Sequence, residues 1–290
     1  MRNRLHAAYI GIVPLNWRYK PEAKVDFLSR IAAIGYQGIQ ISPDQAHDHM
    51  FREALEQVGM TSAEIYVPIR CTLDGVRPGE DEETKKIIDA GKMSKTHMVV
   101  FAVDGSDDRD RIAGRAETGP ALNDLGFTSL AEHISRWASY AEELGMKSSF
   151  HPHAATYIET PSETEVLMSL LPGNVGLCLD TGHWIVGGGD PVAAALQYGP
   201  RITHVHVKDV SEEVLASMIS GKHATMTIAV DDYKLFVPAG TGLLRLKDFF
   251  EALEHGGASG WLMSEQDSAW EPSEEKSILS YENIVTNLKN

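Results

Sequence analysis

Side chains able to bind a metal ion lie near the ends of four short apolar segments in the second half of the sequence. In chain order these are His151 and His153, Asp180 and His183, His204 and His206, and Glu265 and Asp267. Imidazoles combined with carboxylates suit Mn²⁺, Co²⁺, Fe²⁺ or Zn²⁺, whereas Ca²⁺ prefers oxygen ligands alone. We expect a divalent metal, with Mn²⁺ or Co²⁺ favoured and Zn²⁺, Fe²⁺ or Mg²⁺ as alternatives. A single histidine at such a place is more often a hydrogen-bonded structural residue, so only the combination indicates a site.

The segments that carry these residues belong to a regular alternation of strand-like and helix-like stretches. Short runs rich in β-branched residues predict eight strands, at 6–13, 38–42, 61–69, 97–103, 147–153, 175–183, 201–209 and 260–267. Eight strand–helix units in 290 residues are typical of an α/β fold of the (β/α)8 TIM-barrel type, here one domain over residues 1–290. A doubly wound open sheet is the alternative, but no GxGxxG motif follows the first strand and no P-loop occurs.

The stretches between strands show helical periodicity and ordinary helix boundaries. Leu130, Ile134 and Ala138 recur on one stripe of the segment that follows the fourth strand. Gly145 predicts the end of that helix, because glycine readily adopts the left-handed conformation found there. Pro161, followed by acidic residues, predicts the start of the next helix.

Two long insertions interrupt the alternation, at residues 104–127 after the fourth strand and at 211–236 after the seventh. Loops that follow barrel strands lie on the carboxyl-terminal face, where active sites are built. The insertions are therefore either lids over a substrate, or else solvated surface or contacts within a homo-oligomer. Both interpretations stay open at the level of sequence.

Composition and charge exclude several classes of protein. The chain has 26 Lys and Arg against 41 Asp and Glu, a formal net charge of −15, which opposes binding to nucleic acid or an acidic membrane. The two cysteines, Cys71 and Cys178, have no CxxC or metal-type spacing and fit a reducing compartment. No apolar run approaches the roughly 20 residues needed to cross a bilayer. We therefore expect a cytoplasmic protein with neither a nucleic-acid nor a membrane partner.

Several strings carry a resemblance to a known family. LDTGH (179–183), HVHVKD (204–209), PAGTG (238–242) and SEQD (264–267), with PLNW (14–17), resemble the xylose-isomerase-like barrel superfamily of sugar isomerases, epimerases and dehydratases. Within that superfamily, the combination of PLNW, HPHAAT, LDTGHWIVGGGDP, HVHVKDV and WLMSEQD is most similar to the inosose dehydratases, which act on a ketoinositol. The likeness covers most of the chain and is strongest from about 147 to 267.

The resemblance implies a metal held by a Glu, an Asp, a His and a Glu on strands five to eight. Asp180, His206 and Glu265 match three of these positions, and His151 stands where relatives often have the strand-five Glu. His153 is the alternative strand-five ligand. The loss of that carboxylate counts against the ketose epimerases, which the resemblance says need carboxylates on both faces of the substrate carbon.

A metal at such a site favours removal of the proton next to a ketone, because it stabilises the enediolate that forms. Loss of a β-hydroxyl then gives dehydration, so we expect a metal-dependent lyase whose small-molecule partner is a keto-inositol or related keto sugar. The enzymatic alternatives are a keto sugar isomerase or epimerase and a lyase that cleaves a keto-glycoside. An abasic-site endonuclease of the same barrel type and a non-catalytic binding module are the alternatives from other classes.

Four further residues are candidates for catalysis. We expect His153 or His183 to handle the α-proton, since imidazoles titrate near the working pH. Lys208 or His204 would orient the substrate or assist the departing hydroxyl. For Lys208, a salt bridge with Asp209 or Asp180 is an equal alternative.

Other positions receive weaker predictions. Asn16 and Trp17 end the first strand and would contact a sugar-like ring, unless the tryptophan only packs at the rim. Glu64 lies inside the third strand and receives no role, because a shift of one residue would turn it outward. Gly240 and Gly242 suggest a barrel phosphate site, but only Arg245 accompanies them, which favours a neutral polyol.

Overall fold

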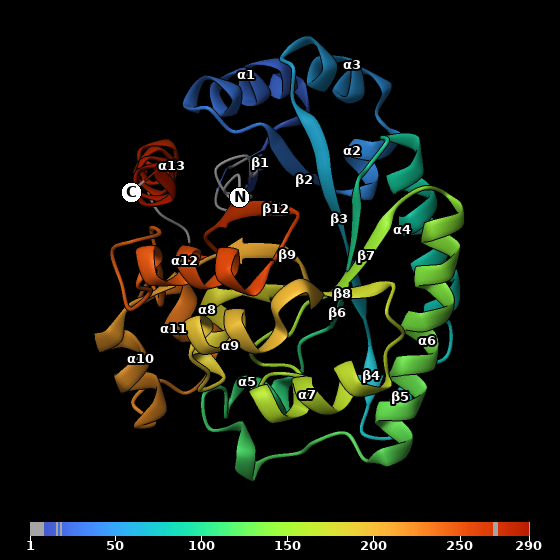
Figure 1. Ribbon diagram of the computed structural model, residues 1–290, viewed down its shortest axis with the longest axis vertical. Helices are drawn as coiled ribbons and strands as arrows, with labels where there is room; N and C mark the ends of the chain where they lie inside the picture. The colour runs from blue at the N-terminus through green and yellow to red at the C-terminus, as the bar shows by residue number, and fades with distance from the viewer. Residues whose placement is uncertain (1–8, 16, 18, 269–271, 290) are drawn as a thin grey trace.

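The computed structural model describes residues 9–15, 17, 19–268 and 272–289, and its centre is a closed parallel barrel (Figure 1). The barrel strands are β1 (Tyr9–Val13), β2 (Gly38–Ile41), β3 (Thr61–Ile69), β6 (Met98–Val103), β7 (Lys147–Phe150), β8 (Val175–Asp180), β9 (Ile202–Val207) and β12 (Trp261–Glu265). Each strand pairs with the next along the chain, and β1 also pairs with β12, which closes the ring. The predicted (β/α)8 barrel and its eight strands are confirmed.

Helices surround the strands on the outside of the barrel (Figure 1). The longer ones are α1 (Lys24–Ile34), α3 (His49–Gln57), α4 (Glu80–Met93), α6 (Asp124–Glu143), α7 (Pro161–Leu170), α9 (Pro191–Tyr198), α12 (Leu246–Gly256) and α13 (Ser273–Lys289). In α6 the predicted stripe is buried against the strands, with Leu130, Ile134 and Ala138 at 1% exposure or less. Within the described part of the chain, no helix is long and apolar enough to cross a membrane.

Helix boundaries follow local chemistry. Thr160 and Glu163 form a capping box that starts α7 at Pro161, as the sequence predicts. Gly35 ends α1 with φ +118°, a backbone conformation that L side chains rarely adopt. An added Cβ there would also lie only 2.4 Å from the Tyr281 hydroxyl, so α1 packs against α13 at this point without room for a side chain.

Several predicted strands are longer than the observed ones, and in two of them the difference moves site histidines out of the strand. β7 ends at Phe150, so His151 and His153 follow the strand rather than forming part of it. Pro152 between them has no N–H to continue the ladder. β8 ends at Asp180, whose side chain accepts a hydrogen bond from His183 N and caps α8 (Thr181–Val186). His183 therefore lies on a helix.

The two insertions fold into short elements over the carboxyl-terminal end of the barrel. The first contains α5 (Asp107–Asp110) and a 3₁₀ turn (Ala116–Thr118). The second contains α10 (Glu212–Ile219) and α11 (Met226–Asp231), and its two ends are joined by the antiparallel pair of β10 (Asp209–Val210) and β11 (Phe236–Val237). Thr227 N donates to Asp110 Oδ1 at 2.9 Å, so the insertions contact each other. Smaller elements complete the chain: α2 (Pro43–His47), β4 (Cys71–Thr72), β5 (Gly75–Val76) and two further 3₁₀ turns (Pro21–Ala23, Gly199–Arg201).

Candidate metal centre

Four side chains predicted as metal ligands meet at the carboxyl-terminal rim of the barrel. His151 follows β7, Asp180 ends β8, His206 lies in β9 and Glu265 ends β12. One nitrogen or oxygen of each side chain lies within 4.8 Å of the corresponding atom of every other. All four residues are buried. Their spacing is short enough for one ion to contact them together, whereas their role as ligands stays a prediction.

Polar atoms inside this group have no hydrogen-bond partner among the residues that the structure describes. Asp180 Oδ2, His206 Nδ1 and Glu265 Oε2 are all buried and lack one. His206 Nδ1 nevertheless lies 2.7 Å from Glu265 Oε2 and 3.7 Å from Asp180 Oδ2. Buried polar atoms without partners are costly, and a cation among them would remove that cost. The donor set therefore fits a divalent ion.

Glu64 is the principal residue that the sequence analysis left without a role. It is fully buried in β3, and its Oε2 accepts a hydrogen bond from His206 Nε2 at 2.9 Å and a shorter one from His204 Nε2. Burial alone would raise the pKa of Glu64, but the charges of His206 and His204 and their hydrogen bonds lower it overall. The ring of His204 contacts Glu64 in the barrel interior. A contact between His204 and a substrate stays a prediction.

Lys208 connects the carboxylates of the rim. Its Nζ lies 3.2 Å from Asp180 Oδ2, 3.4 Å from Glu265 Oε1 and 2.9 Å from Asp267 Oδ2. Burial alone would lower the pKa of Lys208, but these three carboxylates raise it above its usual value, so the ammonium stays charged. The structure thus contains the salt bridge between Lys208 and Asp180 that the sequence analysis gave as an alternative. This salt bridge does not exclude contact between Lys208 and a substrate.

The rings of His153 and His183 lie against each other at a tilt of 36° beside Lys208. Their ring centroids are 3.6 Å apart, and His183 Nε2 lies 2.8 Å from Lys208 Nζ. His153 Nδ1 donates to the Ala154 carbonyl at 2.7 Å, so the lone pair of its neutral ring is on Nε2. Burial lowers the pKa of His153 to about 4, and burial also lowers that of His183. Both rings are therefore neutral near pH 7 and able to accept a proton.

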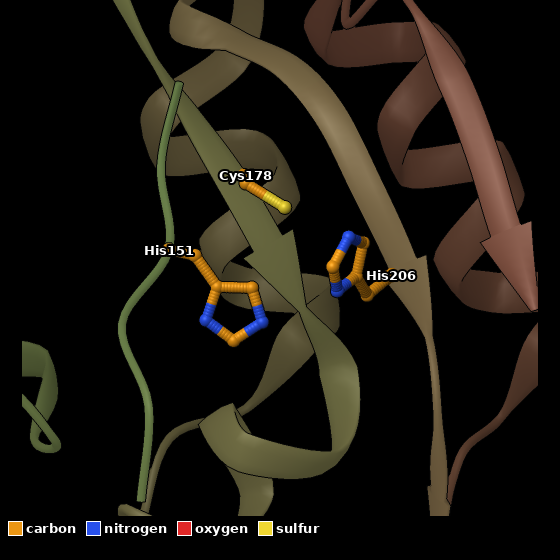
Figure 2. Close-up of side chains that lie close together, drawn as sticks. All are labelled: His151, Cys178 and His206. Atoms are coloured by element: carbon orange, nitrogen blue, oxygen red, sulfur yellow. The ribbon is translucent and has the colours of Figure 1, made fainter. Parts of the chain in front are cut away.

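Cys178 lies next to the ligand group, which its sequence spacing did not indicate. Figure 2 shows its sulfur on β8, directed toward the space between the His151 and His206 rings. Burial raises the pKa of Cys178 to about 12, which keeps the thiol protonated at neutral pH. A thiol of this kind is a weaker ligand than the carboxylates of the rim, since thiolates rather than thiols bind metals.

The glycines of the PAGTG segment serve a carboxylate of the protein itself. Asp209 accepts hydrogen bonds from the backbone N–H groups of Gly240, Gly242, Leu244 and Val210, each 2.8 to 2.9 Å long. An added Cβ at Gly242 would lie 2.2 Å from the Val210 carbonyl oxygen, so only glycine fits this approach. These N–H groups are thus engaged by Asp209, which leaves little for a phosphate.

Of the two predicted first-strand contacts, Trp17 lies in the described part of the chain. Asn16 lies outside the described residues. Trp17 is buried against Phe27, and its indole N–H donates to Ser277 of α13 at 2.9 Å. Its role in substrate binding stays a prediction, and the observed contacts are those of a packed rim residue.

A pocket of about 400 Å³ opens between the two insertions and the metal centre. His153 and Asp267 line this pocket together with Asp107, Asp110 and Asp231 of the insertions. Such a volume is sufficient for a small molecule. Among the described residues, its lining includes Asp107, Asp110, Asp231 and Asp267 but no Lys or Arg, so the pocket disfavours an anionic substrate.

The closed barrel with ligand-capable side chains at its carboxyl-terminal rim defines the structural class of this protein, a (β/α)8 barrel with a candidate metal centre. The chain belongs to the xylose isomerase-like TIM barrel family, whose model matches residues 28–282. It is 31% identical over 288 residues to an inosose dehydratase of Geobacillus kaustophilus (strain HTA426), with 93% of this chain and 91% of the relative covered. The resemblance seen in the sequence is thereby confirmed.

Two solved structures illustrate how widely the fold is shared. The D-allulose 3-epimerase from Methylomonas sp. matches with a TM-score of 0.73 at 16% identity, covering 97% of this chain and 98% of that one. A xylose isomerase-like TIM barrel protein from Mycobacterium smegmatis in complex with magnesium matches with a TM-score of 0.70 at 16% identity, covering 98% and 97%. At such low identities these likenesses show the fold alone.

Proposed function

We propose that this protein is a divalent-metal-dependent lyase that dehydrates a keto-inositol. The observation that carries the proposal is the group of His151, Asp180, His206 and Glu265, whose buried ligand atoms converge beside a neutral histidine pair. Two comparisons support it: the relative named inosose dehydratase, and a structural neighbour of the same fold in complex with magnesium.

The four side chains would hold the ion, and their mixture of nitrogen and oxygen suits Mn²⁺ or Co²⁺, with Zn²⁺, Fe²⁺ and Mg²⁺ as alternatives. When bound, the ion withdraws electron density from a ketone oxygen and so acidifies the adjacent C–H bond. The residues of the chain then have to accept that proton, orient the polyol and assist the departure of a hydroxyl group.

His153 is the residue best placed to accept the α-proton. Its Nδ1 already donates to Ala154, which leaves the Nε2 lone pair as the base, and the residue lines the pocket. His183 has Lys208 Nζ against its Nε2, so its own lone pair is less accessible.

Lys208 is the candidate acid. After the C–H bond breaks, a carbon–carbon double bond forms as the C–O bond to the β-hydroxyl breaks, and that oxygen leaves as water with one added proton. The charged Lys208 ammonium, held by Asp180 and Asp267, can donate that proton. The acidic lining of the pocket fits a neutral polyol better than a sugar phosphate.

Turnover of scyllo-inosose by protein reconstituted with Mn²⁺ or Co²⁺ tests the proposal. The absorbance of the conjugated hydroxy-enone, the enol tautomer of the 1,2-diketone that results from loss of one water, should increase with time, and Asp180→Asn, which weakens the ligand group, should lose this activity. If ketoses interconvert instead and no absorbance develops, the protein is an isomerase or epimerase, and the proposal is wrong.

A further inference from the structure

The carboxylate of Glu64 crosses the barrel interior to reach the histidines of β9. In the sheet, β3 and β9 are separated by β6, β7 and β8, so the contact is made through the barrel rather than between neighbouring strands. Glu64 Oε2 lies 2.9 Å from His206 Nε2 and also contacts His204 Nε2, and all three residues are at 1% exposure or less. A carboxylate buried among barrel side chains needs such partners.

The hydrogen bond between Glu64 and His206 determines where the ring carries its proton. An ionised carboxylate only accepts hydrogen bonds, so His206 Nε2 must be the donor. An imidazole that binds a metal ion is neutral and has a single N–H, so with an ion present the lone pair of His206 would be on Nδ1. That nitrogen is the atom which faces Glu265 Oε2 at 2.7 Å and Asp180 Oδ2 at 3.7 Å.

We propose that Glu64 is a positioning residue, which holds His206 as the Nε2–H tautomer and so presents the Nδ1 lone pair to the metal ion. The inference rests on the proposed function, because it assumes an ion in the group of four. The proposal explains why His206 Nδ1, Asp180 Oδ2 and Glu265 Oε2 converge although none of them has a hydrogen-bond partner among the described residues. Outer partners of metal-bound histidines commonly fix ring orientation and basicity in this way.

The same residues allow a competing arrangement. Glu64, His204 and His206 could themselves surround a second ion deeper in the barrel, because one ligand atom of each lies within 4.8 Å of the others. In that arrangement His206 would bind through Nε2 and carry its proton on Nδ1. The two arrangements thus differ in the protonated nitrogen and in the number of ions bound.

Metal titration of chelator-stripped protein provides the first test. We expect the wild type to bind one Mn²⁺ or Zn²⁺ and Glu64→Gln to bind it about 10- to 100-fold more weakly. Glu159→Gln is the matched control, since Glu159 is also a buried carboxylate but hydrogen-bonds the backbone of Gly114 and Ala155. Its metal affinity should equal that of the wild type.

Two-bond ¹H–¹⁵N correlation spectra of the zinc-loaded wild type provide a second test that needs no folded Glu64 variant. The His206 ring, assigned by its loss in His206→Gln, should carry its proton on Nε2. A proton on Nδ1, two ions per chain, or unchanged affinity in Glu64→Gln would overturn the inference while leaving the proposed function intact. Failure of the wild type to bind any divalent ion would overturn both.

Discussion

His153 and His183 are adjacent and both neutral, but their ring nitrogens are engaged differently. His153 donates a hydrogen bond from Nδ1 to the Ala154 carbonyl, so its Nε2 is a free acceptor. The corresponding Nε2 of His183 lies against Lys208 Nζ. At the scale of single residues, this difference favours His153 over His183 for the proposed proton removal.

Replacing His153 by Gln should lower kcat by about 100-fold or more, because general-base catalysis contributes roughly 10²–10⁴. His183→Gln should have the smaller effect. Steady-state kinetics with scyllo-inosose, together with metal content for each variant, measure this. Equal kcat in wild type and His153→Gln, with metal still bound, would remove His153 from the mechanism.

Residue roles at the rim were partly predictable from the sequence and partly not. The eight candidate ligands, among them His151, Asp180, His206 and Glu265, could be grouped because they lie near the carboxyl ends of strands in a parallel barrel, whereas the choice of these four came from the family resemblance. Glu64 could not be assigned, since its partners lie 140 and 142 residues away on a strand that is not adjacent in the sheet. One signal was available: a carboxylate inside an apolar strand requires buried partners.

At the scale of elements, Asp209 joins the end of β9 to the loop before α12. Asp209→Asn should lower the free energy of unfolding by about 3 kcal/mol, because an amide NH₂ would face N–H donors that now bond a carboxylate oxygen. Urea denaturation measures this. Asp190 caps α9, where its side chain accepts a hydrogen bond from Val192 N. Asp190→Asn is the control, since asparagine caps a helix as well as aspartate does, and it should change stability by less than about 0.5 kcal/mol. Equal losses in both variants would contradict the role of Asp209.

Glu159 connects the first insertion to the loop after β7 through Gly114 N and Ala155 N. Burial raises the pKa of Glu159 from 4.5 to about 7. The folded protein therefore retains this proton at pH values where the unfolded chain has lost it, so the free energy of unfolding falls as pH rises from about 4.5 to 7. The decrease from this group is about 3 kcal/mol and levels off above pH 7.

Urea midpoints of wild type and Glu159→Gln across this pH range isolate the contribution, because the glutamine does not titrate. We expect the wild type to lose more stability than the variant as the pH rises. Parallel pH dependence in the two proteins would show that Glu159 titrates normally.

Strands were predicted well from runs of β-branched residues, but their ends were not. Pro152 ends the β7 ladder and Asp180 caps α8, so both boundaries depend on local backbone chemistry that hydrophobic patterning does not detect. The antiparallel pair of β10 and β11 was not predictable, since each strand has two residues and they pair across the whole second insertion.

At the scale of the whole molecule, closure of the barrel brings four distant segments to one rim. The net charge of −15 and the acidic pocket lining favour a neutral, small substrate over a polyanion. The central claim is that His151, Asp180, His206 and Glu265 share one divalent ion there.

The most direct test of that claim is the metal content of wild type and Asp180→Asn. Each protein is loaded with Mn²⁺, passed through gel filtration and measured by mass spectrometry. The account predicts about one equivalent of Mn²⁺ per wild-type chain and a large loss in the variant, in which a rim carboxylate becomes a neutral amide. No Mn²⁺ in the wild type, or the same amount in both proteins, would contradict it.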